Sequence, residues 1–278
     1  MQQIIGPADI IIEAWDIFRR RLRIYAEFVV WWVILSMTQW AVVILSRTLV
    51  PDRMLRFLVI TLVSIPVWLI FAAITIAVIT VTAQDIRRKE PDVREALYTS
   101  FHKLLSFVWV TVLKYALALL PSLLFFGPFM AYLARPSAAL GVATLAGALA
   151  GLILTVAVII WLKFATDFVV VEDVRGTAAL RDSRVLSLGR WWAVMFRIAI
   201  PFLFFLLVAL FFRAVLYLVL GAMLGDPRLF FGTVADPEQI TVIHSLVTSL
   251  VPQLVAGFVL PLMVAADLIL WFDLRKRR

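Results

Sequence analysis

The sequence contains no cysteine and only two histidines, His102 and His244. This composition excludes disulfide bonds, thiolate metal sites and cysteine nucleophiles, and it argues against a histidine-based metal centre. Charged residues are also scarce: they make up 16% of the chain, where an ordinary globular domain has about a quarter. We therefore expect neither a bound metal nor a cofactor.

Signatures of the common enzyme classes are missing as well. The chain has no His-Glu-x-x-His, no P-loop, no dinucleotide-binding glycine fingerprint and no Gly-x-Ser-x-Gly. No pair of carboxylates is spaced convincingly for acid–base catalysis. The sequence thus predicts a protein that is not an enzyme. An intramembrane enzyme, whose polar site the repeats described below would have to assemble, is the least favoured alternative.

Apolar residues, in contrast, make up 64% of the chain, and its mean hydropathy is +1.02. A single globule of this size cannot bury such a surplus, so lipid is its natural solvent. About 20 apolar residues cross the hydrocarbon as a helix, and continuous apolar runs favour helices over the alternating strands of a barrel. The six runs that are long enough are 28–46, 57–84, 115–134, 136–162, 198–225 and 239–266. The predicted fold class is all-α integral membrane, with six transmembrane helices.

Basic residues are distributed unequally between the two ends of these spans. The net charge is +8, and nineteen Lys and Arg residues flank the spans on the side of both termini, against five on the other side. The positive-inside rule therefore predicts a multi-pass protein of the cell inner (plasma) membrane with both termini in the cytoplasm. The expected partners are membrane lipids, above all anionic phospholipid, or a membrane protein, and not nucleic acid.

An internal repeat organises the chain. Three segments superimpose on the anchor alanines Ala14, Ala96 and Ala179, which are 82 and 83 residues apart. Each unit consists of an amphipathic segment followed by a helical hairpin of two spans. Because each unit holds an even number of spans, the repeats are parallel rather than inverted. The predicted units, within a single membrane domain of residues 1–278, are about 8–88, 89–175 and 176–278.

Each repeat unit closes with a triplet of the form Asp-x-Arg. An arginine at a cytoplasmic helix C-terminus suits both the helix dipole and anionic lipid. The aspartate either caps the following turn or pairs with an arginine of a neighbouring unit, so a threefold ring of pairs is one hypothesis. The triplet residues are Asp85, Arg87, Asp173, Arg175, Asp273 and Arg275.

The first amphipathic segment, residues 9–25, has charged residues on one helical face and apolar residues on the other. Such a helix lies in the headgroup plane with its arginines directed at phosphates, or it packs on the bundle as a cytoplasmic cap. The two interpretations are compatible, and the sequence leaves open whether these segments are continuous with their spans. Arg19, Arg20 and Arg21 are the predicted lipid contacts.

Ionisable residues in or near the spans are costly, and four of them are candidate site residues. Lys114 and Arg197 occupy matching positions of the second and third repeats. They either extend to the headgroups or bind a lipid phosphate or a carboxylate. Asp167 and Asp267 are expected to form structural ion pairs, with a proton or cation relay as the alternative.

Ala143, Gly147 and Gly151 form a stripe of small residues at helical spacing in the fourth span. Such a stripe lets a second helix approach closely. We expect the contact to lie within one chain rather than between two chains.

Three motifs carry a family resemblance: Ala-Leu-x-x-Ser from Ala179, the run from Val169 to Asp173, and Trp-Phe-Asp-Leu-Arg from Trp271. Over nearly the whole chain they resemble an uncharacterised prokaryotic multipass membrane family related to the membrane domain of glycerophosphoryl diester phosphodiesterases. The resemblance implies a six-span helical domain with ties to phospholipid metabolism. It transfers no catalytic residue, because the phosphodiesterase chemistry belongs to a separate soluble domain. Trp271 stands where the family usually has a tyrosine.

Two functions fit these features. The leading hypothesis is a non-enzymatic multispanning inner-membrane protein that engages anionic phospholipid or a partner protein at its basic cytoplasmic face, in membrane organisation or lipid handling. The alternative is a small-solute or lipid transporter whose cavity is lined by Lys114, Arg197, Asp167 and Asp267.

Overall fold

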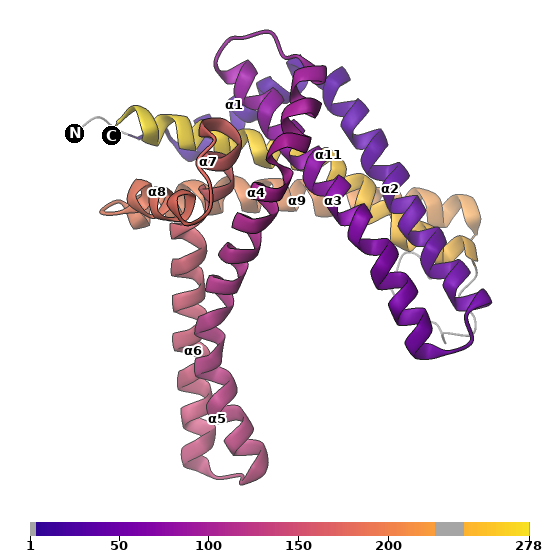
Figure 1. Cartoon of the computed structure of the whole chain (residues 1–278), viewed down its shortest axis with the longest axis vertical. Helices are drawn as coiled ribbons and strands as arrows, with labels where there is room; N and C mark the ends of the chain where they lie inside the picture. Colours follow the sequence, from indigo (N-terminus) through magenta and orange to yellow (C-terminus); the bar gives the residue numbers. More distant parts are fainter. Residues whose placement is uncertain (1–3, 226–241, 278) are drawn as a thin grey trace. The chain divides into compact units, whose positions relative to one another are not determined.

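The computed structural model describes residues 4–225 and 242–277 (Figure 1). Within this part of the chain every regular element is a helix, and six helical stretches are long and apolar enough to cross a membrane. These stretches are Leu22–Leu49, Arg53–Ile86, Val93–Ala134, Ala138–Glu172, Trp191–Leu224 and Val242–Lys276. The prediction of an all-helical chain with six candidate membrane spans is confirmed.

Long continuous helices satisfy the backbone hydrogen bonds that lipid cannot satisfy. Three of them begin at side-chain caps: Asp52 accepts a bond from the amide of Leu55 at 2.7 Å, Asp92 accepts one from Glu95 at 3.2 Å, and Ser137 accepts one from Leu140 at 3.3 Å. The helices in chain order are α1 (Pro7–Arg20), α2 (Leu22–Leu49), α3 (Arg53–Ile86), α4 (Val93–Leu119), the 3-10 helix η1 (Leu120–Ser122), α5 (Leu123–Ala134), α6 (Ala138–Trp161), α7 (Ala165–Glu172), α8 (Thr177–Ser187), α9 (Trp191–Leu224) and α11 (Val242–Lys276).

The three amphipathic segments join their spans in two different ways. α1 ends at Arg20 and α2 begins at Leu22, so the first segment is a helix of its own. The third segment is also separate, because α8 ends at Ser187 and α9 begins at Trp191. The second segment continues directly into its span as α4. The sequence left this question open, and one chain contains both arrangements.

The chain forms two compact units. Unit 1 comprises the described parts of Met1–His102 and Ile198–Leu270, and unit 2 comprises Lys103–Arg197 with the described part of Trp271–Arg278. In unit 1, α2 and α3 form a helical hairpin, and α1 packs against both of its helices.

Hydrogen bonds hold α11 against α2 within unit 1. The indole of Trp32 donates to Gln253 Oε1, and the indole of Trp40 donates to Ser245 Oγ, both at 3.2 Å. The two bonds lie two turns apart on each helix, so α11 follows α2 over that length. The segment from Val264 to Leu270 of α11 is almost entirely buried and forms much of the core of this unit.

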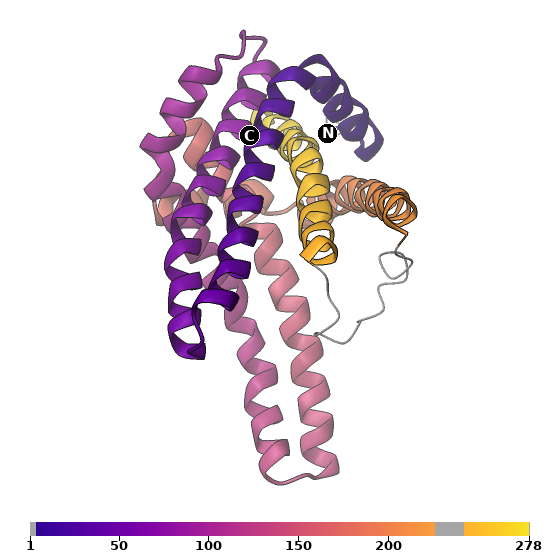
Figure 2. The same ribbon diagram turned by 90° about the vertical axis from the view of Figure 1, so that its right-hand side faces the viewer.

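In unit 2, α5 and α6 form a hairpin whose helices run side by side in both views (Figure 1 and Figure 2). Gly147 and Gly151 of α6 face the backbone carbonyls of Leu124 and Pro121, and a Cβ at Gly151 would lie 2.8 Å from the Pro121 oxygen. Neither glycine leaves room for a side chain. The predicted contact of the small-residue stripe within one chain is confirmed at these two glycines, whereas Ala143 is exposed.

We expect Gly147→Ala to lower the melting temperature of the purified protein in detergent, because the added methyl group would overlap the carbonyl of Leu124. Overpacking of this kind costs about 1–3 kcal/mol. The matched control is Gly127→Ala in α5, where a Cβ would meet nothing within 4 Å. Alanine is favoured over glycine inside a helix, so this control should keep or slightly raise the melting temperature. Identical unfolding of Gly147→Ala and wild type would contradict the close contact.

Candidate functional site

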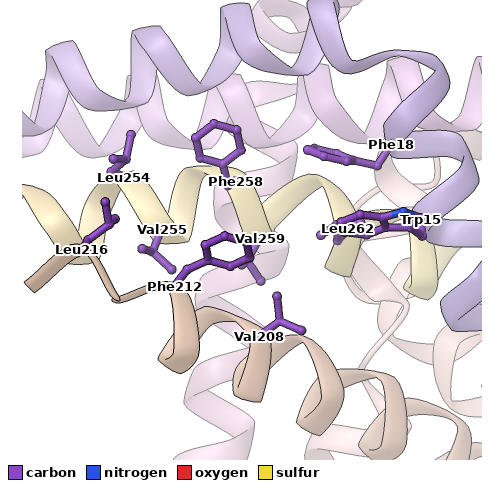
Figure 3. Close-up of a pocket in the computed structure, with 10 residues that line it drawn as sticks. All are labelled: Trp15, Phe18, Val208, Phe212, Leu216, Leu254, Val255, Phe258, Val259 and Leu262. Carbon is purple, nitrogen blue, oxygen red and sulfur yellow. The ribbon is translucent and has the colours of Figure 1, made fainter. Parts of the chain in front are cut away.

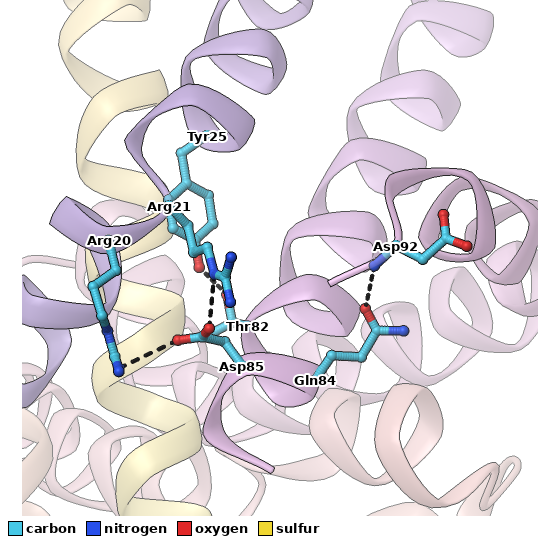
Figure 4. A network of polar contacts seen from close by, with 7 residues as sticks. All are labelled: Arg20, Arg21, Tyr25, Thr82, Gln84, Asp85 and Asp92. Carbon is cyan, nitrogen blue, oxygen red and sulfur yellow. Dashed lines mark hydrogen bonds and ion pairs between the residues drawn. The ribbon is translucent and has the colours of Figure 1, made fainter. Parts of the chain in front are cut away.

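The first polar cluster lies in unit 1, where the break between α1 and α2 meets the end of α3 (Figure 4). Arg21, the residue at the break, donates from Nε to Asp85 Oδ1 at 2.8 Å. Arg20 Nη2 lies 3.3 Å from Asp85 Oδ2, an ion pair without hydrogen-bond geometry. The Asp85 side chain is only 5% exposed, so two guanidinium groups compensate one buried carboxylate. The cluster ties α1 to α3 and keeps one positive charge in excess.

A neutral hydrogen bond reinforces this anchor. The Tyr25 hydroxyl lies 2.9 Å from Thr82 Oγ1, and Thr82 donates its own proton to the Val78 carbonyl at 2.7 Å, so Tyr25 is the donor. The ring of Phe18, on α1, stacks on the ring of Tyr25 with centroids 5.7 Å apart. No local pattern marks Tyr25 and Thr82 as partners, because they lie 57 residues apart in sequence.

The second polar cluster lies in unit 2, where α4 meets the end of α7. Lys103 Nζ donates to the Val170 carbonyl at 2.8 Å and lies 3.9 Å from Asp173 Oδ1, while Arg175 lies 3.6 Å from Asp173 Oδ2. Asp173 caps α7 in the left-handed conformation, with φ of 56°. Its side chain is 53% exposed, so solvent weakens these ion pairs relative to those of Asp85.

The third triplet is held by different partners. Arg275 forms two parallel hydrogen bonds with Glu172, 2.9 Å from Nε and 3.0 Å from Nη2, and its guanidinium lies 5.8 Å from the ring centroid of Phe168. Asp273 accepts two bonds from Arg277, one turn later, at 2.8 and 2.9 Å. Glu172 was not among the predicted site residues, although it lies inside the Val-Val-Val-Glu-Asp run, directly before a triplet aspartate.

The two clusters correspond to each other under the predicted repeat. The three anchor alanines are all fully buried. Arg21 stands seven residues after Ala14, and Lys103 stands seven residues after Ala96. Each of the two pairs with the triplet aspartate of its own predicted repeat: Arg21 with Asp85, and Lys103 with Asp173. The third predicted repeat has Leu186 at this position, and leucine cannot form an ion pair.

Among the predicted lipid contacts, exposure differs strongly from residue to residue. Arg19 is exposed, and the Arg20 side chain is 63% exposed despite its contact with Asp85. Arg21 is committed to the buried carboxylate. Arg87 is exposed directly after the end of α3. Arg19, Arg20 and Arg87 therefore remain accessible in this basic region, whereas Arg21 is bound to Asp85.

The four ionisable residues predicted in or near the spans are divided between the units. Lys114 donates at 3.3 Å to a backbone carbonyl between α6 and α7, and Arg197 donates at 2.9 Å to a carbonyl one turn earlier in its own helix. Both belong to unit 2, as does Asp167, which is buried in α7. Asp267 belongs to unit 1, in α11.

An apolar cavity of about 370 Å³ lies in unit 1 among α1, α9 and α11 (Figure 3). Its walls come from two residues of α1, three of α9 and five of α11, and every one of them is apolar. Trp15 and Phe18 form the α1 wall, and Phe212 and Phe258 face it from the other two helices. None of the predicted site residues lines this cavity, and local sequence cannot reveal it, because its walls lie about 200 residues apart.

Within residues 4–225 and 242–277, no group of three or more His, Asp or Glu side chains is arranged to hold a metal ion. No family model matches the chain, and the comparisons find no matching curated protein and no matching solved structure. The family resemblance drawn from the three motifs therefore stays a prediction.

We expect Asp85→Asn to destabilise the protein by about 1–3 kcal/mol, because it leaves two guanidinium groups without their charged acceptor. Asp173→Asn should cost less than about 1 kcal/mol, since that carboxylate is half exposed and its ion pairs are longer. Thermal unfolding in detergent measures both, with Glu90→Gln at an exposed position as the control. Equal losses for the two aspartates would show that burial does not distinguish the clusters.

Proposed function

We propose that the chain is a non-enzymatic multi-pass protein of the inner (plasma) membrane that engages anionic phospholipid at a basic cytoplasmic face, in membrane organisation or lipid handling. The observation that carries the proposal is α1. This helix is anchored through Arg20 and Arg21 to a buried carboxylate, and it bears exposed arginine next to exposed apolar residues.

The exposed residues of α1 support an interfacial position over a purely water-facing cap. Ile12 is 61% exposed and Trp15 is 43% exposed, while the opposite face, with Ile10, Ala14 and Ile17, is buried against the protein. The exposed face also carries Asp9, Glu13 and Asp16, so its apolar part is limited to these two side chains. A cap in water would leave both uncovered, whereas a helix in the headgroup plane covers them with lipid. Tryptophan is also the residue enriched at that level of the membrane.

The charges around α1 support anionic lipid as the partner. Arg19 is exposed, the Arg20 side chain is 63% exposed, and the Arg23 side chain is 95% exposed. The anchor at Asp85 keeps this end of α1 in place, with Arg19 and Arg20 in its last turn and Arg23 at the start of α2, 4.0 Å from Glu27. Arginine binds phosphate oxygens in a bidentate manner, which favours a phospholipid headgroup over a general anion.

The proposal includes three parallel repeats, each made of an amphipathic helix and a helical hairpin. Its support is the correspondence between the Arg21–Asp85 and Lys103–Asp173 pairs, together with three buried alanines at matching positions. In this arrangement the amphipathic helices and the triplets share the cytoplasmic side, because each hairpin returns the chain to the side where it began.

Anionic lipid preference is expected to depend on Arg19 and Arg23. The double variant Arg19→Glu/Arg23→Glu should lower the ratio of phosphatidylglycerol to phosphatidylcholine retained by the purified protein by roughly tenfold or more, since each basic residue near an anionic surface contributes about 1 kcal/mol. Native mass spectrometry of protein taken from mixed-lipid proteoliposomes measures the ratio. Asp85 keeps its partners in this variant, so the fold is preserved.

The matched control is Arg47→Glu/Arg53→Glu, which makes the same change of charge at exposed positions near the other ends of α2 and α3. This variant should retain the wild-type lipid ratio. An unchanged ratio in Arg19→Glu/Arg23→Glu would contradict the proposal. Loss of a co-purifying protein from that variant, with no change in lipid, would assign the basic face to a protein partner instead.

Both termini are expected in the cytoplasm. A reporter that is active only in the cytoplasm should be active when fused after residue 278 and inactive when inserted between Val50 and Pro51, in the loop between α2 and α3. The physical reason is the excess of basic residues on the terminal side of the spans. Activity of the reporter in the loop, and not at the C-terminus, would reverse the topology and refute the cytoplasmic position of α1.

A further inference from the structure

The apolar cavity among α1, α9 and α11 adjoins a second hollow of about 640 Å³ between α1 and α9. The two share Trp15, Val208 and Phe212 as walls and therefore lie side by side along α9; Figure 3 shows these three residues among the walls of the first cavity, and the two hollows together are called the groove below. Each volume lies within the range of about 300–1,000 Å³ that is usual for sites of small molecules. The groove is therefore large enough to hold a chain-like ligand.

The chemistry of the walls determines what can fill the groove. All walls of the first cavity are apolar, and a cavity of this kind offers water no hydrogen-bond partner. The described residues leave the aromatic side chains of this cavity partly exposed: Trp15, Phe212 and Phe258 are 43%, 52% and 42% exposed. The helices that form it are, apart from α1, candidate membrane spans. A hydrocarbon chain is the occupant that satisfies these conditions.

The charge on α1 selects the kind of molecule that carries this chain. Ile12, Trp15 and Arg19 follow one another at spacings of three and four residues, so Arg19 lies one turn beyond the aromatic wall on the same side of the helix. Asp16 lines the second hollow and disfavours an anion there. A negative headgroup is thus favoured at the Arg19 end of α1 and disfavoured along the rest of the groove.

We infer that the groove binds one acyl chain of an anionic membrane phospholipid whose phosphate is held by Arg19. This inference rests on the proposed function and assigns it a specific site. The guanidinium group supplies two hydrogen bonds to the phosphate, while Trp15 and Val208 enclose the chain beside it. The lipid is then a bound ligand with a defined stoichiometry, distinct from the exchanging lipids around the spans.

The test is native mass spectrometry of the full chain purified from proteoliposomes that contain phosphatidylglycerol and phosphatidylcholine. Val208→Trp fills the groove at a wall shared by both hollows and should reduce the lipid-bound fraction by roughly tenfold or more. Val208→Phe is a milder filling variant that guards against misfolding. Leu210→Trp is the matched control, because Leu210 is 49% exposed on the same helix and lines neither hollow. Arg19→Gln should keep one lipid bound but lose the preference for phosphatidylglycerol.

The inference is supported if wild type and Leu210→Trp each retain one lipid and the folded Val208 variants lose it. Equal retention by the Val208 variants overturns it, and so does a wild-type protein that retains no lipid or whose groove is covered in a dimer. Loss of lipid from Val208→Trp with no effect of Arg19→Glu/Arg23→Glu on the headgroup ratio would refute the proposed function and Arg19 as the phosphate ligand, and would leave the acyl-chain groove standing. The converse result would refute the groove alone.

Discussion

A carboxylate withdrawn from water has to be paired, and Asp85 meets this requirement with Arg20 and Arg21. The pairing fixes the end of α1 against α3, and the stacking of Phe18 on Tyr25 fixes its orientation. The remaining features of α1 depend on that placement. With the helix held in this way, its arginines stay exposed on one side, and Trp15 and Phe18 form a wall of the apolar groove. A single polar contact therefore supports both the basic surface and the cavity.

The features that could be predicted from the sequence are those that depend on neighbours along the chain. Apolar runs of about 20 residues predict spans whatever they pack against, because lipid imposes the same demand on each of them. The stripe at Gly147 and Gly151 predicts a close helix contact for a similar reason, since only a residue without a side chain lets two backbones approach. The predicted repeat likewise singled out the triplets, and with them Asp85 and Asp173.

The partners of these residues could not be predicted, because they are set by tertiary packing. Arg21 and Asp85 are 64 residues apart, and Glu172 and Arg275 are 103 residues apart. Many cationic residues lie near the span ends, and only the packing of the helices decides which one reaches a given carboxylate. The apolar groove is less accessible still to sequence reasoning, because Trp15 lies on an ordinary amphipathic face until α9 and α11 are packed beside it.

The third amphipathic helix, α8, is held in place by bonds of another kind. Leu186 stands where the first two predicted repeats have a basic residue, and the buried Ser183 hydroxyl instead donates to the Trp161 carbonyl at 2.8 Å. A hydrogen bond between neutral groups is insensitive to ionic strength, whereas the ion pair of Lys103 with the half-exposed Asp173 is screened by salt. The contacts of these helices thus respond differently to salt: a rise in its concentration weakens the ion pair between α4 and Asp173, while the bond from Lys103 to the Val170 carbonyl and the bond that holds α8 persist.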